Sequence, residues 1–130
     1  MKSNTTAEQS LETADRLFKA IERGDVAAIR GIYAPNAKIW HNNDGKTQSV
    51  DENLAVLGWV VANISEISYT EARRHPTPTG FVQQHVMRGR LKKTGKEFVL
   101  PACIVCEVAN GRITRLDEYL DSAHTAALTG

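Results

Sequence analysis

The stretch EFVLPACIVCEVANGRITRLDEYL, residues 97–120, decides the fold class. Apolar and polar residues alternate with a period of two on both sides of Asn110-Gly111, and this dipeptide is typical of a two-residue type I′ hairpin. The stretch therefore predicts two antiparallel strands, at residues 97–109 and 112–120. The same period extends upstream and predicts earlier strands near residues 67–74 and 81–92.

Helical spacing replaces this alternation in the first half of the chain, where apolar residues recur at intervals of three and four. Each predicted helix has a capping residue at its start and a glycine, a proline or a change of pattern at its end. The predicted helices are bounded by Thr6 (or Thr5) and Gly24, by Asp25 and Pro35, and by Ser49 and Ile64, with a short strand at residues 37–42.

Three helices followed by a meander of long strands predict an α+β fold, with the helices packed on one face of a curved, mostly antiparallel sheet. The pattern shows no internal repeat and no boundary, so residues 1–130 are expected to form one domain. A curved sheet closed by helices forms a cone. The interior of such a cone holds either its own side chains or a ligand.

Composition excludes several classes of function. The net charge is +1, from 16 basic and 15 acidic residues, which argues against nucleic acid as a partner. No window approaches the ~18 apolar residues that a membrane span needs, and the N-terminus lacks the apolar core of a signal peptide. A cytoplasmic protein without a membrane partner is therefore expected.

Cys103 and Cys106 are the only cysteines and are spaced as C-x-x-C. On a strand, residues three apart point to opposite faces. We therefore expect two buried reduced thiols here and not a redox pair.

Two segments resemble the nuclear transport factor 2-like superfamily. Residues 24–42, with Gly24-Asp25-Val26 and YAPNAKIWHN, resemble its helix-to-strand entry, and residues 110–121 (NGRITRLDEYLD) resemble its last strand. The likeness is nearest to the SnoaL-like and ketosteroid-isomerase-like branch. It implies a cone-shaped fold and homodimers through the outer face of the sheet. It does not fix the function, because the superfamily includes isomerases, cyclases, epoxide hydrolases, dehydratases and non-catalytic binders.

The resemblance to ketosteroid isomerases puts His41 at the position of the catalytic base, a role that suits an imidazole. The oxyanion-binding tyrosine of that family falls at Leu17 and its aspartic acid partner at Cys103. Neither side chain is a good hydrogen-bond donor, so steroid isomerisation by that route is not expected.

The resemblance to limonene epoxide hydrolases places their catalytic positions at His85, Met87, Glu118, Trp40 and Asn42. Of these five residues, only Asn42 and the carboxylate Glu118 are of the residue types that the family uses. The acid–arginine–acid relay is interrupted at Met87, so that hydrolysis is not expected either.

Strand alternation suggests a different constellation, in which His85 and Glu118 meet inside the cone beneath Trp40 and Asn42. A buried Glu beside a His is a usable acid–base pair. The alternative is a structural polar pair with no catalytic role. Because neighbours on a strand face opposite ways, either Trp40 and Asn42 or His41 lines the cone, and we favour Trp40 and Asn42. The remaining side chains expected at the pocket are Leu17, Phe18, Leu57, Met87 and Cys103.

These residues predict a cofactor-free isomerase or cyclase that acts on a small apolar carbonyl compound, with His85, Glu118 and His41 as the catalytic candidates. The alternative is a non-catalytic ligand-binding or dimerisation domain. His41, His85 and Glu118 also match the residue types of an iron triad, but they lie on three strands without ligand spacing, so no metal is expected. An outer face with Arg88, Arg90, Tyr69 and Tyr119 is the expected homodimer surface.

Overall fold

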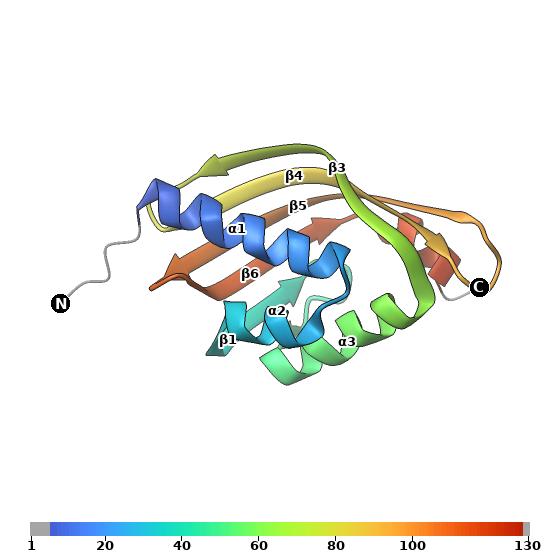
Figure 1. Cartoon of the computed structure of the whole chain (residues 1–130), viewed down its shortest axis with the longest axis horizontal. Coiled ribbons are helices and arrows are strands. Elements are labelled where there is room, and N and C mark those ends of the chain that lie inside the picture. Colours follow the sequence, from blue (N-terminus) through green and yellow to red (C-terminus); the bar gives the residue numbers. More distant parts are fainter. Residues whose placement is uncertain (1–5, 129–130) are drawn as a thin grey trace.

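The computed structural model describes residues 6–128, in which helices cover one face of a six-stranded sheet (Figure 1). The helices are α1 (Ala7–Glu22), α2 (Val26–Ile32) and α3 (Val50–Asn63). The strands are β1 (Tyr33–His41), β2 (Thr47–Gln48), β3 (Ile64–Pro76), β4 (Gly80–Leu91), β5 (Glu97–Ala109) and β6 (Arg112–Leu120), and a 3-10 helix, η1 (Ser122–Leu128), follows.

The sheet has the strand order β2-β1-β6-β5-β4-β3. β1 runs parallel to β6, and the other neighbouring strands are antiparallel. This arrangement confirms the predicted α+β class, with helices packed on a mostly antiparallel sheet. Within residues 6–128, no helix is both long enough and apolar enough to cross a membrane.

Side-chain caps fix where the helices start. Thr6 Oγ1 accepts a hydrogen bond from the Gln9 amide at 3.1 Å, and Ser49 Oγ accepts one from the Glu52 amide at 3.2 Å. Two predicted ends are wrong. The second helix stops at Ile32 and not at Pro35, because Tyr33 already has extended backbone angles, and Ile64 is the first residue of β3 and not the end of α3.

Left-handed backbone angles mark the turn and the bends of the sheet. Asn110 and Gly111 have φ of 53° and 73°, which confirms the predicted type I′ hairpin. Glu66 and Glu71 in β3 also have positive φ, and the register with β4 shifts at both places. These bulges turn Tyr69 toward the helices, where its ring contacts Phe18 at 4.9 Å, so its expected place on the outer face is wrong.

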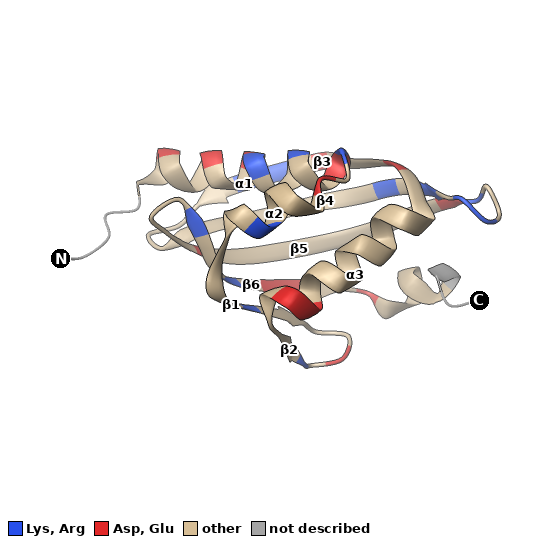
Figure 2. Cartoon of the chain, turned by 60° about the horizontal axis from the view of Figure 1, so that its bottom comes forward, with Lys and Arg blue, Asp and Glu red and all other residues tan. Residues whose placement is uncertain are grey.

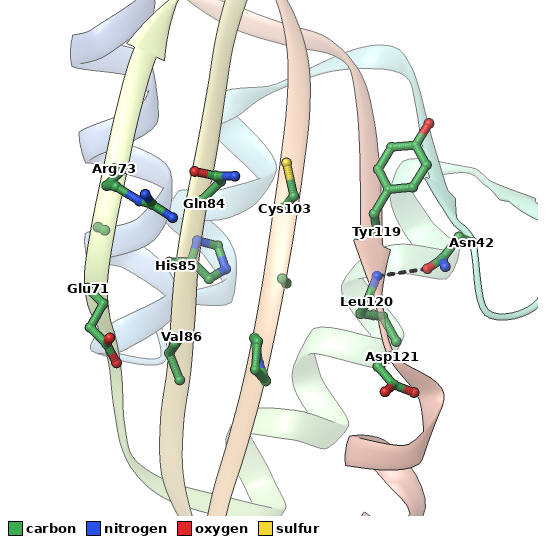
Figure 3. Close-up of a pocket in the computed structure, with 13 residues that line it drawn as sticks. Asn42, Glu71, Arg73, Gln84, His85, Val86, Cys103, Tyr119, Leu120 and Asp121 are labelled. Atoms are coloured by element: carbon green, nitrogen blue, oxygen red, sulfur yellow. Dashed lines mark hydrogen bonds between the residues drawn. The ribbon is translucent and has the colours of Figure 1, made fainter.

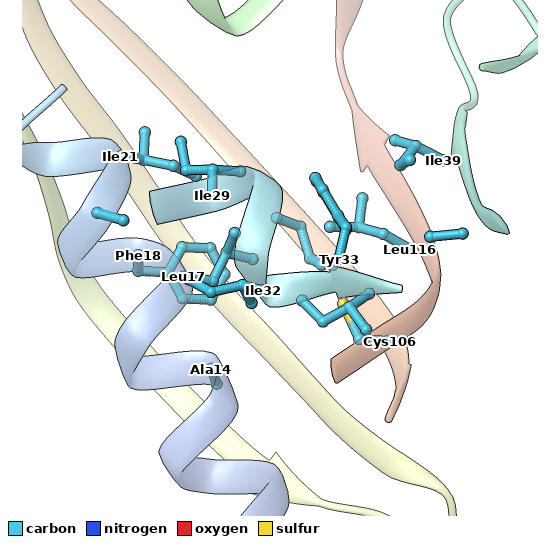
Figure 4. Packing of buried hydrophobic residues seen from close by; sticks show 14 of the residues in the cluster. Ala14, Leu17, Phe18, Ile21, Ile29, Ile32, Tyr33, Ile39, Cys106 and Leu116 are labelled. Carbon is cyan, nitrogen blue, oxygen red and sulfur yellow. The ribbon is translucent and has the colours of Figure 1, made fainter. Parts of the chain in front are cut away.

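The core lies between the sheet and the first two helices, as Figure 4 shows. Leu17 and Ile29 are fully buried there. A second, smaller cluster lies at the other end of the sheet and consists of Ile64, Leu91, Phe98 and Leu100. Side chains of both clusters border one cavity.

Candidate functional site

A cavity of about 400 Å³ lies between α1, α3 and the inner face of the sheet. Its walls are mainly apolar, and α3 carries charge only in its first turn (Figure 2). Four of the side chains expected at a pocket line this cavity, namely Leu17, Phe18, Leu57 and Met87. The other apolar lining residues are Ile21, Val56, Val60, Ile64, Phe98, Leu100, Ile104, Leu116 and Leu120.

His41 and Glu118 form a polar pair on the wall of this cavity. His41 Nε2 lies 3.0 Å from Glu118 Oε1, and the two side chains are 17% and 18% exposed. The pairing follows from the sheet, because His41 and Glu118 are register partners in the parallel pair β1–β6. Their side chains therefore share the inner face.

The pair controls the charge of the imidazole. Burial lowers the pKa of His41, but the hydrogen bond and the negative charge of Glu118, together with the charge of Asp44, more than offset it. The net effect raises the pKa of His41 above its ordinary value of 6.5. The protonated imidazolium beside the carboxylate is therefore favoured below pH 6.5, and such a pair can take up or release a proton.

Further polar side chains line the same cavity, and three of them, Tyr33, Asn53 and Gln48, are joined by hydrogen bonds that the sequence did not predict. Tyr33 Oη donates to Asn53 Oδ1 at 3.1 Å, and Asn53 Nδ2 donates to Gln48 Oε1 at 3.2 Å. Tyr33 and Asn53 are 3% and 4% exposed. One signal was available, because Asn53 lies three residues after Val50 and four before Leu57, on the buried stripe of α3.

His85 points toward α1, but it is not among the lining residues of the cavity and does not form a hydrogen-bonded pair with Glu118, so its predicted place beside Glu118 is wrong. Its ring packs against Tyr69 and Phe18, with centroid distances of 4.7 and 5.4 Å. Its Nδ1 lies 2.9 Å from Gln83 Nε2. Burial, which outweighs the opposing charge of Glu118, lowers the pKa of His85, so this imidazole is favoured in its neutral form.

The predicted orientation of Trp40 and Asn42 is wrong, because His41 occupies the inner face of β1. Trp40 packs on Tyr119 with a centroid distance of 5.3 Å, and Asn42 Oδ1 accepts from the Leu120 amide at 2.8 Å. Cys103 also faces outward, since its register partner is Tyr119, whereas Ile104 is the partner of Glu118. Asn42, Cys103 and Tyr119 line a separate groove of about 830 Å³ on the outer face (Figure 3).

Several other histidine, tryptophan and cysteine side chains do not line the cavity. His75 and His124 are exposed. Trp59 is 46% exposed on α3. Cys103 and Cys106 are free thiols, and only Cys106 is fully buried. Among residues 6–128, no group of three His, Cys, Asp or Glu side chains is arranged to hold a metal ion.

Comparison with known proteins places the chain in a family. Residues 14–116 match the model of the SnoaL-like domain. The chain belongs to this family. A relative, an uncharacterized protein of Mycobacterium tuberculosis (strain ATCC 25618 / H37Rv), is 31% identical over 125 residues, which are 92% of this chain and 95% of the relative.

Solved structures confirm the fold of this SnoaL-like protein. A protein of Bacillus subtilis, for which isomerase activity is proposed, has a TM-score of 0.83 at 16% identity, over 97% of this chain and 96% of that one. A proposed polyketide cyclase of Xanthomonas campestris pv. campestris also has a TM-score of 0.83, at 18% identity, over 97% and 100%. Further similar structures are called NTF2-like or ketosteroid isomerase-like. At these identities the likeness establishes the fold and not the reaction.

Proposed function

We propose that this SnoaL-like protein is a cofactor-free isomerase or cyclase that uses acid–base chemistry on a small apolar carbonyl compound. The observation that carries the proposal is the pair of His41 and Glu118, 3.0 Å apart on the wall of a largely apolar cavity. Relative to the sequence interpretation, His41 replaces His85 as the partner of Glu118.

The proposed reaction begins with Glu118. Its carboxylate takes a proton from the carbon next to the substrate carbonyl, and the electron pair of that C–H bond moves into an enolate. The His41 imidazolium offsets the negative charge that develops nearby. In an isomerase the proton returns to a different carbon. In a cyclase the enolate carbon attacks a second carbonyl of the same molecule, and the proton ends on the new alkoxide.

The cavity also fits the substrate class. Its volume of about 400 Å³ lies within the range of small-ligand pockets, ~300–1,000 Å³. Apolar side chains of α1, α3 and the sheet would hold the hydrocarbon part, while the polar pair meets the carbonyl end. His85 lies behind Phe18 and Tyr69 and would support that wall.

Deuterium exchange tests the proposal without knowledge of the natural substrate. A panel of neutral ketones that begins with 2-acetylnaphthalene is incubated with the protein in D2O, and deuteration next to the carbonyl is followed by NMR. We expect exchange above the buffer rate, and a loss of at least about 100-fold in Glu118→Gln, because general acid–base catalysis contributes ~10²–10⁴-fold. The control is Glu107→Gln, an exposed glutamate of β5. Equal exchange by Glu118→Gln and wild type would rule the proposal out.

The alternative is a non-catalytic ligand-binding or dimerisation domain, and the outer face of the sheet favours a role in dimerisation. Tyr119 and Val105 are 48% and 36% exposed there, next to the contact of Trp40 with Tyr119. We propose a homodimer through this face. Sedimentation should give a dimer for wild type and for the control Lys19→Ala, an exposed lysine of α1 on the opposite side of the sheet, and a monomer for Tyr119→Asp. A monomeric wild type would contradict the homodimer.

A further inference from the structure

Tyr33, Asn53 and Gln48 form a directed chain of hydrogen bonds at the polar end of the cavity. The Tyr33 hydroxyl donates to Asn53 Oδ1 at 3.1 Å, and Asn53 Nδ2 donates to Gln48 Oε1 at 3.2 Å. A hydroxyl has one proton and an amide has one oxygen and one nitrogen. The chain therefore uses the oxygen of Gln48 and leaves its amide nitrogen as the donor end.

The direction of this chain is stable. Burial raises the pKa of Tyr33 far above its ordinary value of 10.0, so the hydroxyl keeps its proton. Asn53 is 4% exposed and cannot reorient its amide without leaving a buried group unpaired. The donor end at Gln48 is thus fixed by two buried neighbours.

Gln48 lies on the same side of the cavity as the acid–base pair. It is the register partner of Ile39 in the β1–β2 pair, two residues before His41 on the same strand. Both Gln48 and Glu118 line the cavity. A ligand whose carbonyl oxygen accepts from Gln48 would thus meet the pair with an adjacent carbon.

The charges around the cavity favour a neutral ligand over an anion. None of its described lining residues is Lys or Arg, whereas Glu118 and Asp44 are acidic. His41 carries the one basic group among these residues, and Glu118 already pairs with it. A bound carboxylate would lack a cation and would face like charge.

We propose that Gln48 is the carbonyl-binding donor of this cavity, and that the Tyr33–Asn53–Gln48 chain selects neutral carbonyl compounds over carboxylates. The inference rests on the proposed function and adds to it the group that holds the substrate oxygen. As negative charge develops on that oxygen during proton removal, a donor held by buried neighbours stabilises it.

The first arm of the test compares two probes with the same ring system, 2-acetylnaphthalene and 2-naphthoate, by titration calorimetry with wild type. We expect the ketone to bind at least about tenfold more tightly, because the carboxylate lacks a cationic partner. Equal or tighter binding of 2-naphthoate, or no binding of either probe, would overturn the proposal.

The second arm changes the donor. Gln48→Glu keeps an oxygen for Asn53 but removes the N–H donors, and Gln48→Met removes the donors without adding charge. Each should weaken ketone binding by about three- to tenfold, the value of one neutral hydrogen bond. The carbonyl stretching band of the bound ketone should move to higher wavenumber. The control is Thr47→Ala, an exposed neighbour on β2.

A carbonyl band at the same position in wild type and in both Gln48 variants would overturn the inference, even if affinity changed through altered packing. The outcomes also separate the two proposals. A Gln48 effect on the band without Glu118-dependent deuteration would refute only the catalytic function. Glu118-dependent deuteration without a Gln48 effect on the band would refute only the carbonyl-binding role.

Discussion

Replacing Glu118 with glutamine should reverse the direction in which the pKa of His41 departs from 6.5. In wild type, burial lowers this pKa, but Glu118 and Asp44 together raise it above 6.5. Glu118 provides both a hydrogen bond and the larger of the two charge effects. With a neutral glutamine in its place, burial outweighs Asp44, so the pKa of His41 should fall below 6.5.

The distance between the two groups sets the size of the associated stability change. Unit charges 3.0 Å apart attract by about 1.4 kcal/mol at the dielectric constant of water and about 5.5 kcal/mol at an effective value of 20. Partial desolvation offsets much of this, which leaves ~1.5–3 kcal/mol for a charged hydrogen bond. The introduced glutamine retains a neutral hydrogen bond worth ~1 kcal/mol. We therefore expect Glu118→Gln to lose about 0.5–2 kcal/mol of unfolding free energy below pH 6.5.

The pH dependence has a defined sign. The pKa of His41 is higher in the folded than in the unfolded protein. Its contribution to the free energy of unfolding is therefore fully present below pH 6.5 and is lost as the pH rises through the folded-state pKa. In Glu118→Gln, where the pKa of His41 is lowered, the contribution of His41 to stability should instead begin to fall as the pH drops below 6.5.

NMR titration of the histidine ring protons measures each imidazole separately, with His41→Asn to assign the signal. Urea unfolding across the same pH range gives the free energies. A wild-type His41 that titrates at or below 6.5, or a pKa that Glu118→Gln leaves unchanged, would refute the reasoning about the pair.

Three further outcomes are expected. Gly80→Ala should lower the free energy of unfolding by about 3 kcal/mol, because a Cβ there would lie 1.9 Å from the Cys106 carbonyl oxygen. Gly58→Ala, with open space around it in α3, should raise that free energy by about 1 kcal/mol. Urea unfolding measures both, and equal effects of the two variants would contradict this prediction. Iodoacetamide should modify Cys103 in the native protein but Cys106 only after unfolding, because burial raises the pKa of the Cys106 thiol, and peptide mass spectrometry decides between them. Because burial lowers the pKa of His85, stability should decline as the pH falls below 6.5, and His85→Met should remove part of that decline in urea unfolding.

The elements that local chemistry controls were predictable from the sequence. Asn110-Gly111 imposes positive φ at both positions, and Thr6 and Ser49 cap the helices they precede. These signals act within a few residues, so one sequence is enough to detect them. The apolar lining by Leu17 and Phe18 follows equally from helical spacing.

The composition of the polar site was less predictable, because it depends on register between strands far apart in sequence. Alternation alone left His41 and Trp40 as alternative candidates for the inner face. The parallel pairing of β1 with β6 places His41 opposite Glu118 and so puts His41, and not Trp40, on the inner face. Gln48 lies on a two-residue strand with no period of its own, and only its pairing with β1 brings it to the cavity.

A crystal structure of the protein with 2-acetylnaphthalene bound would test the central claim most directly. The account predicts the ketone inside the cavity, with its oxygen within hydrogen-bonding distance of Gln48 Nε2 and its methyl carbon next to Glu118. A ketone bound only in the outer groove beside Cys103 and Tyr119, with the cavity empty, would contradict it.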